Sequence, residues 1–480
     1  MRLARGRLAR TALSLAALGA VLAPQAGGAS AAPAVYAGPT PGVACDRTSL
    51  PEKTQGRAPL SDVATGRYAL GYSCNAQMVS HFGTTGGYRV ERYVDTSGHV
   101  CAFYDSTLLF PKDVPEQGTE GPGVYVMDMH DPAHPILSTT LQSPAMLSPH
   151  ESVRLNVKRG LLVADMGYPT ANPGFVDVWD VSQNCLKPTL RGSSPLGVFG
   201  HEGGFSPDGL TFYVASLYFH TLAAVDLTNP AVPSLLWLTT DYQPHGVSIS
   251  EDGNRLYMAE SPFQTGFRGL TVLDVSQVQK RVLNPAVPII SRLTWPQVGT
   301  PQNATPFTRG GHKYLMEIDE FGSGAHIGAA RIIDVQDEKR PFVVSNMRLA
   351  VNQEAAQTPD LKADPGADQQ FQGYQGHYCT LPSRVDPTIV ACSFIMSGLR
   401  VFDISVPSRP REIAYFNKPL VPKSKVNPMT AGAFAMAAPA YDPVHGDIWY
   451  SDGNSGFYVV RLTGVARAKP FARSLVLPGN

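Results

Sequence analysis

A short apolar segment recurs seven times along this chain and constrains its fold more than any other feature. The copies follow one another at steps of 46 to 69 residues, and the first six end on aspartate. A repeat of this length, with about four short strands in each copy, is typical of propeller blades. The sequence therefore predicts an all-β protein, a single seven-bladed β-propeller of four-stranded blades. The segments end at Asp128, Asp180, Asp226, Asp274, Asp334, Asp403 and Arg461.

The stretch from His201 to Asp226 is the clearest copy of the whole repeat. It holds an apolar strand, a Ser206-Pro-Asp-Gly209 turn, a second strand that starts near Leu210, and the segment that ends on Asp226. The second strand alternates apolar and polar residues with period two, which favours strands over helices. An open β-solenoid is the competing architecture, but its repeats are shorter. The aspartates are expected to be structural and to close turns after the third strand.

The last copy, at residues 436–465, leaves few residues for an outer strand. A segment near residues 60–90 is expected to supply that strand and to close the ring. Two longer inserts interrupt the repeats, at residues 275–303 and 350–375. The second insert is polar, which predicts a long surface loop and a candidate lid. The predicted divisions are a signal peptide at 1–32, an irregular lead-in at 33–60, the propeller at 61–465 and a tail at 466–480.

The first 32 residues resemble a secretory signal peptide. Four arginines within the first ten residues precede an apolar run at residues 11–23, and Ala29-Ser30-Ala31 supplies small residues for cleavage. The apolar run is short for a membrane span, although an uncleaved anchor helix is the alternative. No twin arginine precedes the run and no cysteine lies at the cleavage site. We therefore expect a Sec-type signal and a secreted, extracellular protein without a lipid anchor or sorting motif.

Six cysteines form an even set, which favours disulfides in an exported chain. Cys379 and Cys392 lie on neighbouring predicted strands around one turn, so these two are expected to pair. Cys45 with Cys74 could tie down the N-terminal segment, which leaves Cys101 with Cys185. No Cys-x-x-Cys metal pattern occurs.

Composition restricts the classes of partner. The 39 basic and 39 acidic residues give no net charge, so the chain lacks the electrostatic signature of a nucleic-acid or anionic-membrane binder. A P-loop, a Rossmann fingerprint, a Gly-x-Ser-x-Gly elbow and a His-Glu-x-x-His helix are all absent from the sequence. We expect a monomer that is not inserted into a membrane and that binds a small molecule or an extracellular protein.

Histidines recur at one position of the repeat. The residue eight before the turn between the first and second strands is histidine in four blades, Asn303 in the fifth, Val90 in the first and Ala438 in the last. Innermost strands of a propeller start at one end of its central channel, so four imidazoles would converge there. Three or four imidazoles form a site for a transition metal such as copper, iron or zinc. The predicted metal ligands are His150, His201, His245 and His377.

Carboxylates accompany these histidines. Glu151 and Glu202 directly follow two of them and could orient imidazoles. Second strands should end at the same face, where Glu260 and either Asp319 or Glu320 fall. Glu151, Glu202 and Glu260 are therefore the candidates for acid–base catalysis. The competing interpretation is a structural ring in which each histidine binds the backbone of the neighbouring blade.

Other histidines fall outside this series. His312 lies at a predicted turn and is out of step with the repeat. His326 could reach the channel from a loop. The remaining histidines are expected to have surface or packing roles.

The repeat motifs resemble those of known propellers. Leu399-Arg-Val-Phe-Asp-Ile-Ser405 and Leu270-Thr-Val-Leu-Asp-Val-Ser276 look like the LVIVD repeat of exported bacterial propellers. The stretches Ser206 to Val214 and Ser250 to Met258 are similar to YVTN-type repeats. The layout more distantly resembles selenium-binding proteins of the methanethiol oxidase type, which are copper-dependent propellers. The LVIVD resemblance covers roughly residues 88–465 and implies the fold, whereas a fold does not fix an activity.

Two functions follow as hypotheses. The first is a secreted β-propeller with a histidine-lined channel mouth that binds a transition metal and catalyses a metal-dependent redox or hydrolytic reaction. The second is a non-catalytic extracellular module, an LVIVD-repeat surface protein that binds its partner at the channel mouth or at a blade edge.

Overall fold

The computed structural model describes residues 35–106, 121–165, 174–261, 266–322, 326–367, 373–417 and 432–471. The chain divides into two units, Met1–Ala34 and Val35–Asn480, and every described residue belongs to the second. The expected signal peptide at 1–32 lies outside the described residues, as does most of the expected tail.

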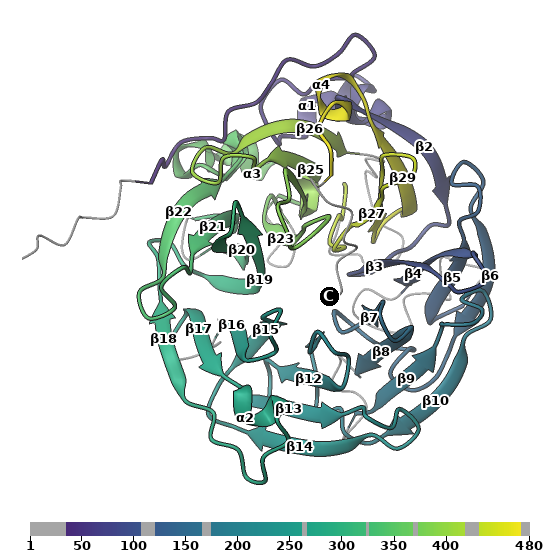
Figure 1. Cartoon of the computed structure of the whole chain (residues 1–480). Helices are drawn as coiled ribbons and strands as arrows, with labels where there is room; N and C mark the ends of the chain where they lie inside the picture. The colour runs from purple at the N-terminus through teal and green to yellow at the C-terminus, as the bar shows by residue number, and fades with distance from the viewer. Residues whose placement is uncertain are drawn as a thin grey trace, which may run out of the picture. The chain divides into compact units, whose positions relative to one another are not determined.

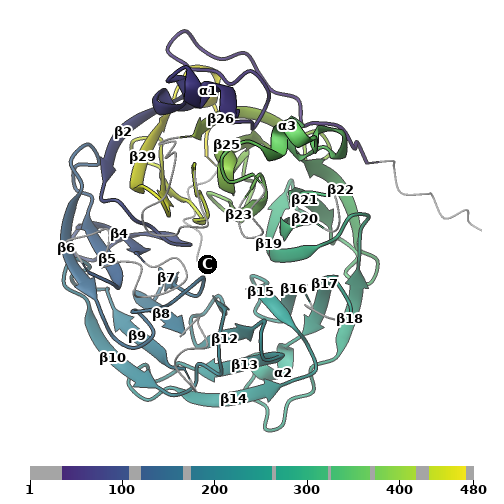
Figure 2. The ribbon, with the colours of Figure 1, turned by 180° about the vertical axis from the view of Figure 1, so that it is seen from behind.

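Seven antiparallel sheets stand around one central channel (Figures 1 and 2), which confirms the predicted seven-bladed propeller. Successive blades pack through their strands, and β27 of the last blade meets β3 of the first. We number the blades one to seven from β3. The innermost strands line the channel: β3 (Val90–Val94), β7 (Arg154–Asn156), β11 (Glu202–Phe205), β15 (Pro244–Ile249), β19 (Thr300–Arg309), β23 (Gly376–Thr380) and β27 (Ala440–Asp442).

The second strand of each blade is buried between its neighbours. In β12, every residue from Thr211 to Ser216 is buried, because blades cover one another on both faces and exclude water from the aliphatic and aromatic side chains. The second strands are β4 (Val100–Asp105), β8 (Leu161–Asp165), β12 (Thr211–Ser216), β16 (Arg255–Glu260), β20 (His312–Phe321), β24 (Ile389–Phe394) and β28 (Asp447–Asp452).

The third strands are the recurring segments of the sequence. In blades one to six the closing aspartate accepts a hydrogen bond from the backbone N–H two residues later, for example Asp226 from Thr228 at 2.9 Å. This short-range turn confirms the structural role predicted for these aspartates. The strands are β5 (Val124–Asp128), β9 (Val176–Asp180), β13 (Thr221–Asp226), β17 (Gly269–Asp274), β21 (Ala330–Asp334), β25 (Gly398–Asp403) and β29 (Gly456–Leu462).

The outer strand of blade seven comes from the N-terminal part of the chain. Strand β2 (Ala76–Phe82) pairs with β29 and closes the ring, as the shortness of the last repeat predicted. Strand β1 (Tyr72–Cys74) adds a fifth strand to blade six. The other outer strands are β6 (Ile136–Leu141), β10 (Thr189–Ser194), β14 (Ser234–Thr239), β18 (Ile289–Leu293), β22 (Phe342–Met347) and β26 (Arg411–Asn417).

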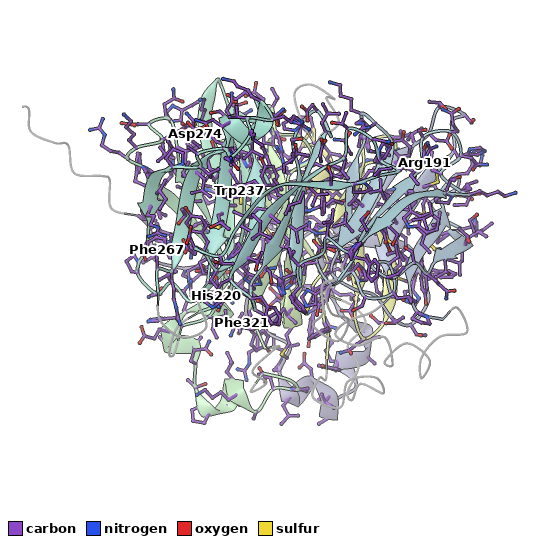
Figure 3. The ribbon with its side chains drawn as sticks, turned by 90° about the horizontal axis from the view of Figure 1, so that it is seen from below. Arg191, His220, Trp237, Phe267, Asp274 and Phe321 are labelled. Carbon is purple, nitrogen blue, oxygen red and sulfur yellow. A yellow bond between two sulfur atoms is a disulfide. The ribbon has the colours of Figure 1, made fainter. Side chains whose placement is uncertain are left out.

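Short helices decorate the ring. The insert after β22 packs against the N-terminal segment, where Arg57 pairs with Asp360 and Asp364. In Figure 3 the helices of both segments stand on the face near which His220 and Phe321 lie, opposite Asp274. The helices are α1 (Leu60–Ala64), η1 (Arg67–Leu70), α2 (Ser276–Gln279), η3 (Ala350–Asn352), η4 (Glu354–Ala356), α3 (Pro359–Lys362), η5 (Ile395–Ser397) and α4 (Gly464–Arg467).

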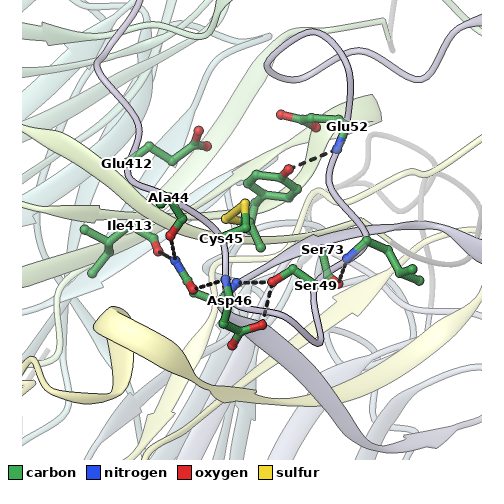
Figure 4. Close-up of a disulfide and its surroundings, with 12 residues drawn as sticks. Ala44, Cys45, Asp46, Ser49, Glu52, Ser73, Glu412 and Ile413 are labelled. Carbon is green, nitrogen blue, oxygen red and sulfur yellow. Dashed lines mark hydrogen bonds between the residues drawn. A yellow bond between two sulfur atoms is a disulfide. The ribbon is translucent and has the colours of Figure 1, made fainter.

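All six cysteines form disulfides, in the three pairs that the sequence predicted. Cys45–Cys74 fastens the N-terminal segment beside blade six, where Asp46 and Ser49 add hydrogen bonds (Figure 4). Cys101–Cys185 joins blade one to the loop after β9, whereas Cys379–Cys392 lies within blade six. Within the described part of the chain, no helix is both long and apolar enough to cross a membrane.

The Cys101–Cys185 bond should stabilise the propeller more than Cys379–Cys392. It spans 84 residues of sequence against 13, and a longer closed loop removes more entropy from the unfolded chain. We expect the double variant Cys101→Ala/Cys185→Ala to lose about 2–4 kcal/mol of unfolding free energy, and Cys379→Ala/Cys392→Ala about 1 kcal/mol less. Denaturant unfolding under oxidising conditions measures both values. An equal or reversed order would contradict the loop-length argument.

Candidate metal centre in the central channel

Strand pairing identifies which residue of each blade points into one layer of the channel. In blade three, Leu222 lies four residues before the closing Asp226 and pairs with Ala215, which pairs with Glu202; the residue before Glu202 is His201. Counting through the pairs in the same way gives the equivalent residues of blades one to seven. These are Tyr88, Glu151, His201, His245, Gln302, His377 and Ala437.

Three of these residues lie in β-bulges. Pro244 pairs with Glu260 and Gly246 with Ala259, which leaves His245 between them without a partner. Gln302 and His377 are skipped in the same way. A bulged residue is released from the alternation of the strand, so its side chain can be aimed away from the ladder.

This layer corrects the alignment made from the sequence. In blade five the position belongs to Gln302 rather than Asn303, and in blade two it belongs to Glu151 rather than His150. Counting back from the turn failed because the hairpins differ in length and because a bulge adds a residue that sequence spacing does not reveal.

The carboxylate of Glu151 lies among the histidines. Its Oε1 is 3.0 Å from His377 Nε2, and its Oε2 is 3.3 Å from His201 Nε2 and 4.0 Å from His245 Nε2. His150 Nδ1 is 4.0 Å from Oε1. His150, Glu151 and His201 offer ligand atoms within 4.8 Å of one another, so this buried group could hold a metal ion. The four predicted histidines therefore converge on one carboxylate.

His150 reaches the cluster through an unusual backbone conformation. Its φ of 50° lies in the left-handed region, which costs energy for a residue with a side chain. Its ring stacks on Tyr88 at 4.4 Å between centroids and lies 4.3 Å from the ring of His201. The strained residue is thus held by ring packing on two sides.

Two histidines have a defined tautomer. His245 Nδ1 lies 2.8 Å from the carbonyl oxygen of Pro301, and His377 Nδ1 lies 2.5 Å from that of Met436. A carbonyl only accepts, so both Nδ1 atoms carry hydrogen and both Nε2 atoms present a lone pair in the neutral ring. Glu320 adds a second carboxylate, 3.5 Å from His245 Nε2 and 3.7 Å from His377 Nε2.

The cluster is buried, so the histidines form an internal layer rather than an open mouth. His150 is 7% exposed, and His201, His245 and His377 are each 3% exposed or less. Several ring nitrogens lack a hydrogen-bond partner among the described residues: His150 Nδ1, His201 Nδ1 and Nε2, and His377 Nε2. Buried polar atoms are rarely left without a partner, which fits donors that await a cation.

Burial and neighbouring charge shift the protonation of this layer. Burial lowers the pKa of His245 to about 3, and His201 beside it adds to the effect. Burial opposes ionisation of Glu151, but His201 and His377 hold its pKa well below the usual range. Burial raises the pKa of Glu320 well above the usual range, and the charge of Glu151 raises it further.

Glu202 belongs to the next layer of the channel and faces away from the imidazoles. Its Oε1 accepts hydrogen bonds from Arg89 and Arg154 and, at 2.9 Å, from Asn303 Nδ2. Gly246 leaves the space for this carboxylate, because a Cβ there would lie 1.9 Å from Glu202 Oε2. Glu202 therefore supports the layer below the histidines.

Glu260 occupies the end of β16. Its Oε2 accepts a hydrogen bond of 2.6 Å from Thr271 Oγ1 and lies 3.4 Å from Arg292. None of the contacts described for Glu260 involves one of the four histidines. His312 Nε2 lies 2.6 Å from Asp334 Oδ2 at the hairpin turn, so it is outside the cluster as predicted.

Three residues of the centre were not singled out from the sequence. Tyr378 Oη and Gln302 Nε2 both donate to Glu151 Oε2, and Tyr88 covers His150. Tyr378 directly follows His377, as Glu202 follows His201, so its position beside the series was the available signal. Gln302 gave no such signal, because the misplaced alignment pointed to its neighbour.

A second group of possible ligands is less suited to a metal. Asp442, His445 and Asp447 lie close together. Arg461 pairs with Asp447 at 2.7 Å and Arg92 with Asp442 at 3.1 Å, so both carboxylates already face a cation.

No protein-family model and no curated protein matches this chain. Among solved structures, the chain is similar to hydrazine synthase of Kuenenia stuttgartiensis (TM-score 0.47, 12% identity, 79% of this chain and 97% of that one). It is also similar to the periplasmic gluconolactonase of Pseudomonas aeruginosa (TM-score 0.45, 14% identity, 73% and 94%). A third is the β-propeller domain of Cps50 from Myceliophteria thermophila (TM-score 0.48, 11% identity, 81% and 100%).

Buried aspartates fix the loops that lead into the innermost strands of blades one and seven. Asp105 Oδ1 accepts backbone N–H bonds from Tyr88 at 2.9 Å and Arg89 at 3.4 Å, and Asp452 Oδ2 accepts one from Phe434 at 2.8 Å. Burial raises the pKa of Asp105 to about 8 and that of Asp452 to about 6.

Asp105 should make the protein less stable as the pH rises. The folded state holds this proton up to about pH 8, whereas the ordinary pKa is 3.8, so the contribution is full below pH 4 and is lost towards pH 8. Asp105→Asn cannot ionise, and we expect its unfolding free energy to fall less between pH 5 and pH 8 than in the parent, by on the order of 2 kcal/mol. Denaturant unfolding at several pH values tests this. Asp452→Asn is the matched comparison, with its effect centred near pH 6 or below; identical profiles for parent and Asp105→Asn would contradict the argument.

Proposed function

We propose that the histidine layer binds a transition-metal ion, copper, iron or zinc, and that the protein is a secreted, metal-dependent enzyme of redox or hydrolytic type. One observation supports this most directly. The Nε2 lone pairs of His245 and His377 face the oxygens of Glu151 and Glu320 in a buried layer. Acceptors facing acceptors repel, so this arrangement calls for a cation between them.

A proton is the simplest competing cation, and burial disfavours it. Burial lowers the pKa of His245 to about 3, so its ring stays neutral and its Nε2 keeps a lone pair. Neutral imidazoles and carboxylates are donors for copper, iron and zinc. The Nδ1 hydrogen bonds to Pro301 and Met436 are the kind that fix the orientation of ligating imidazoles.

The assigned ligands are His201, His245, His377 and Glu151, and His150 supplies a further imidazole. Tyr378 and Gln302 hold the Glu151 carboxylate through its Oε2. A bound ion of this kind supplies Lewis acidity and, for copper or iron, one-electron chemistry. The chain itself excludes water from the layer and sets the imidazole tautomers.

The acid–base roles of Glu151, Glu202 and Glu260 remain predictions, and the contacts weigh them differently. Glu151 is the member that lies among the imidazoles, whereas Glu202 and Glu260 face arginines. Glu320 enters as an alternative, because it lies next to two imidazoles and its side chain is 14% exposed. Secretion agrees with the three disulfides, and a small-molecule substrate agrees with the narrow channel.

A non-catalytic binding module is the second candidate. Tyr218 and Phe219 are 42% and 44% exposed in the loop after β12, and Tyr218 lies edge-on to His201 at 5.5 Å. Exposed aromatic side chains are frequent at interfaces with protein partners. This candidate predicts binding without stoichiometric metal.

Metal content separates the two candidates. Glutamine already occupies the equivalent position of blade five, so His201→Gln and His245→Gln should fold. We expect one equivalent of ion in the parent after loading and washing, and a loss of affinity of about 100-fold or more in either variant, since even outer partners of a metal are worth 10–100-fold. His312→Gln is the matched control and should retain the ion. Substoichiometric metal that is equal in all four proteins would reject the site.

Chelation should destabilise the parent protein selectively. An ion that binds the folded state at 100 times its dissociation constant adds about 2.7 kcal/mol to the unfolding free energy. We expect the thermal midpoint of the parent to fall after dialysis against a chelator and to recover on reloading, while His201→Gln stays unchanged. A midpoint indifferent to chelation in every protein would contradict a tightly held ion.

A further inference from the structure

The channel continues past the histidine layer into a separate cavity of about 180 Å³. The innermost strands of all seven blades line it. At the layer that pairs two residues before the closing residue of each third strand, five blades carry small side chains, which leaves this volume open. The five are Gly204, Ser248, Thr305, Thr380 and Ala440.

The other two blades place charge at the same layer. Blade two supplies Arg154 and blade one supplies Glu91. Arg154 and Arg89 both donate to one oxygen of Glu202, so two guanidinium groups share one carboxylate. Burial raises the pKa of Glu91 to about 7, so below that pH its proton leaves the surplus positive charge uncompensated.

Two further arginines line the cavity but have partners elsewhere. Arg92 lies 3.1 Å from Asp442, and Arg384 lies 3.3 Å from Glu251. Arg89 and Arg154 therefore carry the surplus, and their side chains are only 4% and 16% exposed.

The cavity is polar at one end and apolar at the other. Asn303 and the hydroxyls of Ser248 and Thr305 join the two arginines near the Glu202 layer. The next residues of the lining strands are apolar, as in Ile249 and Leu381, and Phe471 adds an aromatic ring. An anionic head at the polar end and an apolar body at the other match this gradient. A closed apolar cavity of about 150 Å³ accommodates benzene, so one small ring or short chain fits.

We infer that this cavity binds a small organic monocarboxylate about the size of benzoate or hexanoate, with its carboxylate at Arg154 and Arg89. The guanidinium fork suits a planar carboxylate, and burial strengthens the charge-assisted hydrogen bonds. The inference does not depend on the proposed metal centre, which uses a different layer of the channel.

Titration calorimetry at pH 6 tests the inference on the mature protein after chelation, so that no metal can take the ligand. The probes are benzoate, its neutral analogue benzamide, and acetate, which lacks the apolar body. We expect benzoate to bind more tightly than either analogue. Arg154→Gln removes the surplus charge and leaves Arg89 with Glu202 as a neutral pair, so benzoate should weaken about tenfold or more, the value of a hydrogen bond to a charged group.

Two further variants complete the design. Thr380→Phe fills the cavity without touching an arginine and should abolish benzoate binding, while Arg191→Gln, a surface arginine on β10, should leave it unchanged. Circular dichroism and the thermal midpoint show whether each variant is folded. Absence of benzoate binding to the parent would overturn the inference, and so would equal affinity for benzamide or acetate. Benzoate binding that appears only with metal and disappears in His201→Gln would also overturn it, because the carboxylate would then sit at the histidine layer.

Discussion

The convergence of seven strands on one axis governs this structure. Between blades, apolar faces cover one another, and any aliphatic side chain of suitable size serves. At the axis, side chains from different blades meet each other in a space without room for bulk water, so each polar group must find its partner on another blade. Glu202 illustrates the demand: arginines from blades one and two and Asn303 from blade five all donate to it.

The same demand makes the blades unequal. Gly246 gives up its side chain to admit the Glu202 carboxylate, and Ala437 leaves its place in the histidine layer without a polar group. The layers are also linked. Arg89 donates to the backbone oxygen of Glu151 and lies 4.4 Å over the ring of Tyr378, whose hydroxyl donates to the Glu151 carboxylate. A change in the charge of one layer is therefore felt in the next through hydrogen bonds rather than through the apolar core.

The sequence predicted what depends on local repetition. Closing aspartates such as Asp226 bond to the backbone two residues away, so their spacing reveals each third strand and with it the number of blades. The convergence of four histidines was also accessible, because they recur at one place in the repeat. The identity of the layer was not: a bulge at Gln302 shifts the strand by one residue, and the left-handed conformation of His150 lets Glu151 take the place counted for it. Both features arise from contacts between blades, which leave no periodic trace along one strand.

Blade seven combines strand β2 with strands from the opposite end of the propeller sequence, and this has a consequence for biogenesis. As the polypeptide emerges, β2 has no partner until all the other blades have been synthesised and β29 follows. For that interval one sheet edge at each end stays open to other chains, and exposed edges are the usual route to aggregation. Closure also involves widely separated residues, which is slow in topologies dominated by non-local pairs. The protein must therefore be protected as an open arc before it can exist as a ring, and the cell compartment where β2 meets β29 is the one where the channel first becomes a sealed environment.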